Sequence, residues 1–109
     1  MLKFKVIKSE TNKYKKNNLK KISKYLIDNP KSKLIIYGSA DKSGSAEYNL
    51  ILSEKRANSS KKYLIQLGIR SEQLKVIALG ESRSQNANTE LERAEARSTS
   101  FEIIEDRLK

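Results

Sequence analysis

Two oppositely charged residues, Asp41 and Arg56, lie in and just after a short polar segment that contains glycine. Asp41 falls within residues 38–45, and Arg56 falls about two to three turns into the helix predicted to follow. A carboxylate can bind an ammonium group, and a planar guanidinium can bind a carboxylate through two parallel hydrogen bonds. If the loop folds back over the helix, this pair could bind a free amino-acid end, which carries both charges.

Each of these residues also fits an ordinary structural role. Aspartate is common in turns and at helix N-termini, and most exposed helix arginines contribute little to stability. Asn49, which lies between Asp41 and Arg56, belongs to a residue type that often caps helices or lies on the surface. The functional interpretation therefore depends on all three residues occurring together at this spacing.

The elements expected to position these residues alternate between strands and helices. Apolar runs and alternating patterns predict strands over residues 2–7, 34–37, 74–79 and 98–104. Helical spacing of apolar residues predicts helices over residues 13–28 and 47–67, and a short third helix over residues 89–96. Pro30 ends the first helix, and Gly68 is expected just after the second.

This order of elements, β-α-β-α-β-(α)-β, predicts the fold class. We expect an α/β two-layer sandwich in which helices pack on a mixed four-stranded sheet, and one domain over residues 1–109. The run 34–37 is almost entirely apolar, so we expect a central strand that is covered on both faces.

The composition argues against most catalytic chemistry. The chain has no cysteine and no histidine, which excludes disulfides, thiolate zinc sites, cysteine nucleophiles and a Ser-His triad. No convincing carboxylate pair or Ser-Lys dyad is present either. We therefore expect a protein that is not an enzyme and that needs no metal or cofactor.

The net charge of +10 is concentrated in the first part of the chain. Residues 1–43 hold twelve lysines against three acidic residues. Such a surface attracts nucleic acid, anionic lipid or a carboxylate-rich cell-wall polymer, although solvated surface lysines would look the same. Aromatic residues make up only 6% of the chain and no nucleic-acid-binding motif is present, so nucleic acid is not the expected partner.

No apolar run approaches the roughly 20 residues needed to span a membrane. The first five residues alternate too strongly for a signal peptide. The chain is then either an excised domain of a longer secreted protein or a protein that is soluble where it is made. Contact with a membrane is expected only through parts of a parent protein outside this chain.

Residues 37–64 carry an ordered set of matches to a known family. After a glycine-to-aspartate turn, the helix has the pattern Asn-x-x-Leu-Ser-x-x-Arg-Ala, made by Asn49, Leu52, Ser53, Arg56 and Ala57. Similar pieces follow at Gly80-Glu81, Asn88-Thr89-Glu90 and residues 93–97. Over residues 19–104, the chain resembles the C-terminal domain of the OmpA family.

This resemblance implies a fold, a ligand and a location. Members of the family have a mixed α/β sandwich and bind the diaminopimelate of peptidoglycan stem peptides in the bacterial periplasm, mostly in association with the outer membrane. By similarity, Asp41 would accept hydrogen bonds from the ligand ammonium and Arg56 would bind its carboxylate. Asn49 would bond near the same zwitterion, and Arg97 would line the site.

The chain also departs from the family pattern near the expected site. Ser39-Ala40 stands where the family usually has His-Thr, and Ser60 replaces an apolar residue. Two alternatives to peptidoglycan binding therefore stay open. The chain could keep the fold as a scaffold for protein interaction, or it could bind nucleic acid through its basic N-terminal half.

Overall fold

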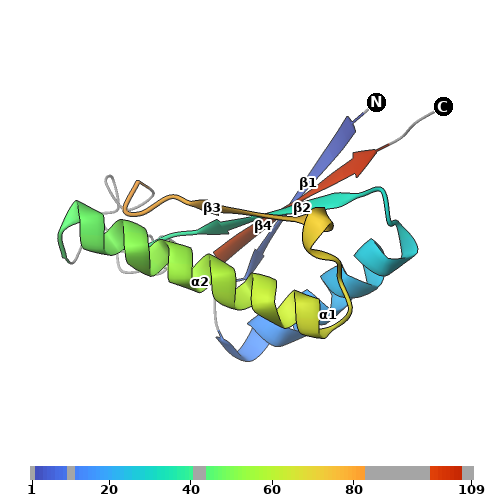
Figure 1. Cartoon of the computed structure of the whole chain (residues 1–109), viewed down its shortest axis with the longest axis horizontal. Helices are drawn as coiled ribbons and strands as arrows, with labels where there is room; N and C mark the ends of the chain where they lie inside the picture. The colour runs from blue at the N-terminus through green and yellow to red at the C-terminus, as the bar shows by residue number, and fades with distance from the viewer. Residues whose placement is uncertain (1, 10–11, 41–43, 83–98, 107–109) are drawn as a thin grey trace.

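A computed structural model describes residues 2–9, 12–40, 44–82 and 99–106 of the chain (Figure 1). Its strands are β1 (Leu2–Ser9), β2 (Lys33–Gly38), β3 (Leu74–Ala78) and β4 (Thr99–Asp106). Its helices are α1 (Asn12–Asp28), α2 (Ala46–Gln66) and the 3-10 turn η1 (Ser71–Gln73). The short helix predicted over residues 89–96 lies outside the described residues. None of the described helices combines the length and the apolar character that crossing a membrane requires.

The sheet is mixed, and its strand order is β1-β4-β2-β3. Helix α2 carries the chain back along the sheet, so β3 pairs with β2 in parallel. The last strand, β4, lies between β1 and β2 and is antiparallel to both. The prediction of a mixed α/β fold is therefore confirmed. The parallel pairing of β2 with β3 places the carboxyl ends of these two strands side by side.

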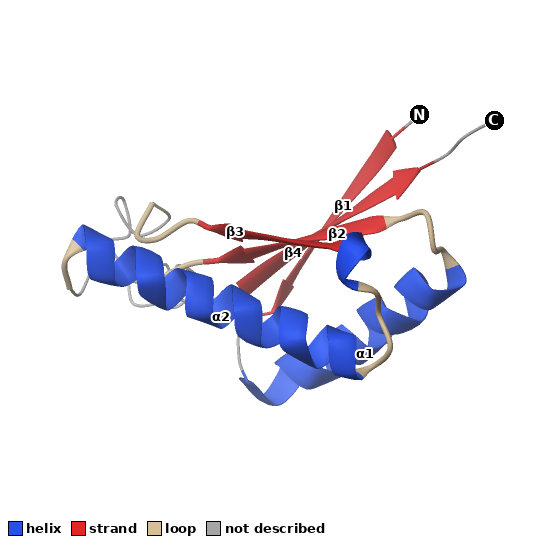
Figure 2. Ribbon diagram, viewed as in Figure 1, coloured by secondary structure: helices blue, strands red, loops and turns tan. Residues whose placement is uncertain are grey.

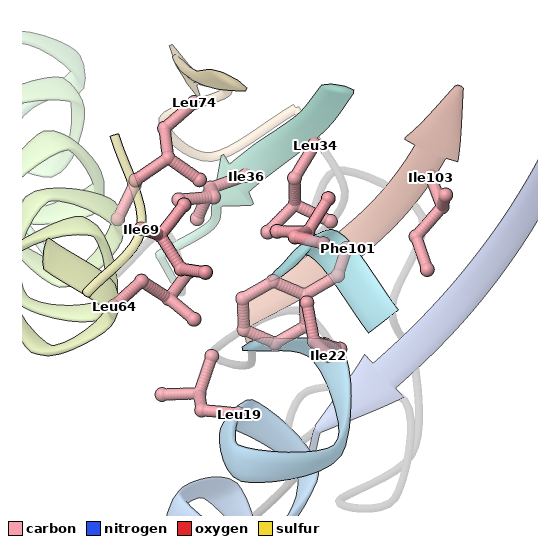
Figure 3. Close-up of a cluster of buried hydrophobic side chains, with 11 residues drawn as sticks. Leu19, Ile22, Leu34, Ile36, Leu64, Ile69, Leu74, Phe101 and Ile103 are labelled. Atoms are coloured by element: carbon pink, nitrogen blue, oxygen red, sulfur yellow. The ribbon is translucent and has the colours of Figure 1, made fainter. Parts of the chain in front are cut away.

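Both helices cover the same face of the sheet (Figure 2). The apolar residues that α1 and α2 bury meet the alternate residues of the strands, and the ring of Phe101 lies beside Ile22 in this core (Figure 3). The buried cluster consists of Leu19, Ile22, Leu26, Leu34, Ile36, Ala57, Leu64, Ile69, Leu74, Phe101 and Ile103. Burial of these side chains is the main driving force that holds the helices against the sheet.

Strand β2 is central, as predicted, but it is not equally covered on its two faces. Leu34 and Ile36 are buried toward the helices, whereas Ile35 and Tyr37 are half-buried on the other face. The expectation of a strand covered on both faces was wrong to that extent, because both described helices lie on one side. On the other face, Tyr37 Oη donates a 2.8 Å hydrogen bond to Glu102 Oε1 of β4.

The two ends of α2 are fixed by local sequence. The side chain of Ser45 accepts a 3.0 Å hydrogen bond from Tyr48 N and so caps the first turn. At the other end Gly68 has a φ of 101°, and Gly68 N and Ile69 N bond to Ile65 O and Leu64 O at 3.0 and 3.1 Å. This is a Schellman motif, and it confirms the role predicted for Gly68.

A buried glutamine connects the end of η1 to the turn between α1 and β2. Gln73 Nε2 donates hydrogen bonds of 3.2, 3.4 and 3.0 Å to the carbonyls of Leu26, Asn29 and Ser32. Buried carbonyls need such partners because water does not reach them. Gln73 therefore holds the entry into β2, the strand whose other end leads to the candidate site.

Candidate ligand-binding site at the ends of β2 and β3

The loops that follow β2 and β3 are bonded to each other. Leu79 N donates a 2.9 Å hydrogen bond to Gly38 O, and Ala40 N donates a 2.8 Å bond to Gly80 O. Gly80 has a φ of 58°, which lets the chain turn sharply after β3. The N-terminal half of α2 lies beside these loops (Figure 1). Three segments that are distant in the sequence thus meet at one edge of the sheet.

Helix α2 approaches the end of β2 unusually closely. A Cβ atom on Gly38 would overlap the carbonyl oxygen of Ser53 and would lie 2.8 Å from the carbonyl carbon of the same residue. It would also lie 3.1 Å from the Cβ of Ala57. The absence of a side chain at Gly38 therefore lets α2 lie directly against the point where the loop leaves the sheet.

The side of α2 that faces the loops is polar. Asn49, Ser53 and Arg56 are spaced four and three residues apart, so they share one face of the helix. Asn49 and Ser53 are fully buried and Arg56 is half-buried. Buried polar groups are costly unless they are hydrogen-bonded, so the partners of these side chains determine what they do.

Ser53 and Asn49 bind the helix to both loops. Ser53 Oγ donates to Leu50 O at 2.8 Å and accepts from Gly80 N at 2.9 Å. Asn49 Nδ2 donates to Gly44 O at 3.3 Å and has a longer contact of 3.5 Å with Glu81 Oε2. The backbone that surrounds the candidate site is therefore held in place by side chains of α2.

Arg56 reaches from α2 to the loop after β2. Its Nη1 donates a 2.8 Å hydrogen bond to Ser39 O, two residues before Asp41 in the sequence. A guanidinium has five N–H groups, and among the described residues no other acceptor binds this one. The arginine is thus oriented by one bond and keeps most of its donors for another partner.

Two buried polar atoms next to these bonds have no partner within the described part of the chain. They are Ser39 Oγ and Asn49 Oδ1, and both residues have an exposed fraction of 0%. Leaving a buried polar atom without a hydrogen bond costs about 1–3 kcal/mol. Such costs are rare in native proteins and call for an explanation, of which a functional site is one.

The structure brings together two of the four residues expected to bind a ligand. Asn49 and Arg56 both contact the loop that follows β2. Asp41 and Arg97 lie outside the described residues, so their predicted roles stay predictions. Arg97 precedes Thr99, the first residue of β4, which pairs with Gly38.

Sequence reasoning missed the residues that hold this region together. The partner that Ser53 finds in Gly80 and the contact between Asn49 and Glu81 were not predicted. One feature of the sequence could have indicated these contacts: polar residues recur at helical spacing along the buried face of α2. Asn49, Ser53 and Ser60 are all buried there.

Comparisons with known proteins identify relatives of the chain. The profile of the OmpA family matches residues 4–98. A peptidoglycan-associated lipoprotein of Buchnera aphidicola is 35% identical over 71 residues, which cover 65% of this chain and 40% of that protein. Outer membrane protein A of Citrobacter freundii is 40% identical over 63 residues, which cover 58% of this chain and 26% of that protein. The chain thus spans less than half the length of these relatives.

Solved structures agree with this relationship. The peptidoglycan-associated lipoprotein of Burkholderia pseudomallei superposes with a TM-score of 0.76 at 28% identity, covering 87% of this chain and 80% of that one. The C-terminal domain of Helicobacter pylori MotB superposes with a TM-score of 0.74 at 19% identity, covering 88% and 75%. The second likeness shows the fold alone. Three of these four proteins are named for the outer membrane or for association with peptidoglycan.

Proposed function

Because this chain belongs to the OmpA family, we propose that it binds peptidoglycan non-covalently and so anchors a cell-envelope protein to the cell wall. The observation that carries the proposal is the placement of Arg56, which is half-buried, oriented by Ser39 O and otherwise unengaged by described residues. The relatives named for association with peptidoglycan support the choice of polymer. The domain would act in the periplasm, in association with the outer membrane.

The ligand we propose is the diaminopimelate end of a stem peptide. This end is a free amino acid with an ammonium and a carboxylate close together. Arg56 would bind the carboxylate through two parallel hydrogen bonds, a geometry that the guanidinium fork allows. Asp41, two residues after the carbonyl that orients Arg56, would bind the ammonium. Arg97 would line the site from the segment before β4.

Asn49 has a different part in this proposal. Its side chain is fully buried, and its Nδ2 is directed to Gly44 O and Glu81. In this arrangement it holds the start of α2 and the turn after β3, and it does not meet solvent. Its Oδ1 has no donor among the described residues, so a ligand that reaches it would satisfy that atom. A direct bond between Asn49 and the zwitterion stays a prediction.

The proposed ligand can be tested with stem tetrapeptides that differ only at the third residue. We expect the peptide with diaminopimelate to bind at least tenfold more tightly than the same peptide with lysine, measured by isothermal titration calorimetry. The lysine peptide lacks the side-chain carboxylate, and a hydrogen bond to a charged group contributes about 1.5–3 kcal/mol.

A matched peptide in which the side-chain carboxylate of diaminopimelate is amidated separates charge from shape. It should bind as weakly as the lysine peptide. Equal affinity for all three peptides would show that Arg56 does not bind this carboxylate. Absence of binding to any of them by a folded protein would favour the protein-interaction scaffold.

A further inference from the structure

Exposed lysines gather on the outer side of α1 and continue through the following turn to the first residue of β2. They are Lys20, Lys21, Lys24, Lys31 and Lys33, here called the α1 lysine surface. No described residue forms an ion pair or hydrogen bond with any of their ammonium groups. The opposite side of α1 carries Leu19, Ile22 and Leu26 into the core. Packing of the helix therefore leaves Lys20, Lys21 and Lys24 exposed to solvent.

The charge of α1 is not balanced along the helix. Residues 12–28 contain six lysines, and Asp28 is their only acidic residue. Like charges on one helix face repel each other and destabilise the helix slightly. An external anion would relieve this repulsion, so the surface is complementary to a densely charged anionic partner.

The type of cation indicates the type of contact. Residues 1–43 have twelve lysines and no arginine. The lysine ammonium is a compact, strongly hydrated charge on a flexible stem, and it lacks the planar fork by which arginine recognises one carboxylate. The α1 lysine surface therefore suits diffuse attraction to many carboxylates, in contrast to the single oriented Arg56.

Lys33 of the α1 lysine surface and the loop of the candidate site lie at opposite ends of β2. Lys33 begins the strand and Gly38 ends it. At about 3.3 Å per residue, the strand separates them by roughly 17 Å. This separation exceeds the Debye length of about 8 Å at physiological ionic strength. One amino-acid end cannot contact Lys33 and the loop after Gly38 together, and at physiological ionic strength Lys33 has little electrostatic effect on a ligand held there.

We infer that the α1 lysine surface is a second contact with peptidoglycan, made with carboxylates of the polymer that neighbour the stem peptide held at Arg56. This inference rests on the proposed function, because the stem peptide brings the polymer against the domain. The second contact adds affinity for the polymer and none for a single soluble stem peptide. It also makes retention on the polymer dependent on ionic strength.

The test compares wild type with a Lys20→Gln, Lys21→Gln, Lys24→Gln variant. Each protein is titrated with insoluble diaminopimelate-type peptidoglycan at low and high ionic strength, and with the soluble stem tetrapeptide. At low ionic strength the variant should bind the polymer about tenfold more weakly, because three exposed charges that attract the polymer are lost. The difference should disappear at high ionic strength, and at physiological ionic strength both proteins should bind the soluble peptide equally.

A variant with Lys55→Gln, Lys62→Gln and Lys75→Gln is the matched control, because it removes the same charge from other exposed positions. Its affinity for the polymer at low ionic strength should fall by less than about threefold. The inference would be overturned if both triple variants lost the same affinity for the polymer. It would also be overturned if the variant at Lys20, Lys21 and Lys24 lost none. Tighter binding to phosphatidylglycerol vesicles or duplex DNA than to peptidoglycan would also overturn it. Failure of wild type to bind the soluble peptide would instead contradict the proposed function.

Discussion

Replacing Arg56 with lysine is expected to weaken binding of the diaminopimelate stem peptide by about 10- to 100-fold while the protein stays folded. Lysine keeps the positive charge but cannot form two parallel hydrogen bonds with a carboxylate. Loss of one charge-assisted hydrogen bond accounts for about 1.5–3 kcal/mol. The substitution keeps a long cationic side chain at a half-buried position, so stability should change little.

Calorimetric titration with the stem tetrapeptide measures this loss, and thermal unfolding in the same buffer checks the fold. Arg70→Lys is the matched control, because Arg70 is exposed in the turn before η1. It should bind like wild type. If Arg56→Lys also bound like wild type, the site would require only a positive charge, and the proposed two-bond geometry would be wrong.

Replacing Gly38 with alanine is expected to lower the free energy of unfolding by about 3 kcal/mol, at the upper end of the usual cost of overpacking. The added methyl group would overlap the carbonyl oxygen of Ser53, which belongs to the backbone of α2 and cannot rotate away. The helix would have to move off β2, and the bonds of Ser53 and Arg56 to the loops would be strained. The affinity of the Gly38→Ala protein for the stem peptide should also fall, because these bonds hold the candidate site.

Gly68→Ala is a suitable comparison because its cost has a different origin. No atom lies within 4 Å of a Cβ at that position, but the φ of 101° is unfavourable for alanine. We expect a loss of about 1–2 kcal/mol from backbone strain alone, with ligand binding unchanged. Denaturant unfolding of both variants measures the difference. A Gly38→Ala protein as stable as Gly68→Ala would show that α2 does not approach β2 as closely as described.

The order and type of the four strands and of α1 and α2 could be predicted from the sequence because each is encoded locally, whereas η1 was not predicted. The apolar spacing on α1, the proline after it and Gly68 after α2 all acted as expected. The insertion of β4 between β1 and β2 could not be predicted, because strand pairing depends on contacts between residues far apart in the chain. The three bonds of Gln73 were missed for the same reason.

The candidate site was predictable to a smaller extent. The ordered family matches at Asn49 and Arg56 predicted that both lie near one site, and the structure places both against the loop that follows β2. These matches could not show that Ser53 binds Gly80 or that Asn49 lies near Glu81, because these contacts arise only when two loops meet at the sheet edge.

Co-sedimentation with purified diaminopimelate-type peptidoglycan tests the central claim most directly. Wild type would be compared with Asp41→Ala and Arg56→Ala at high ionic strength, where attraction by surface lysines is screened. Circular dichroism would confirm that all three are folded. Wild type is expected to pellet with the polymer, and both variants are expected to stay in solution. Equal pelleting of all three proteins, or no pelleting of wild type, would contradict the claim that this domain holds peptidoglycan through Asp41 and Arg56.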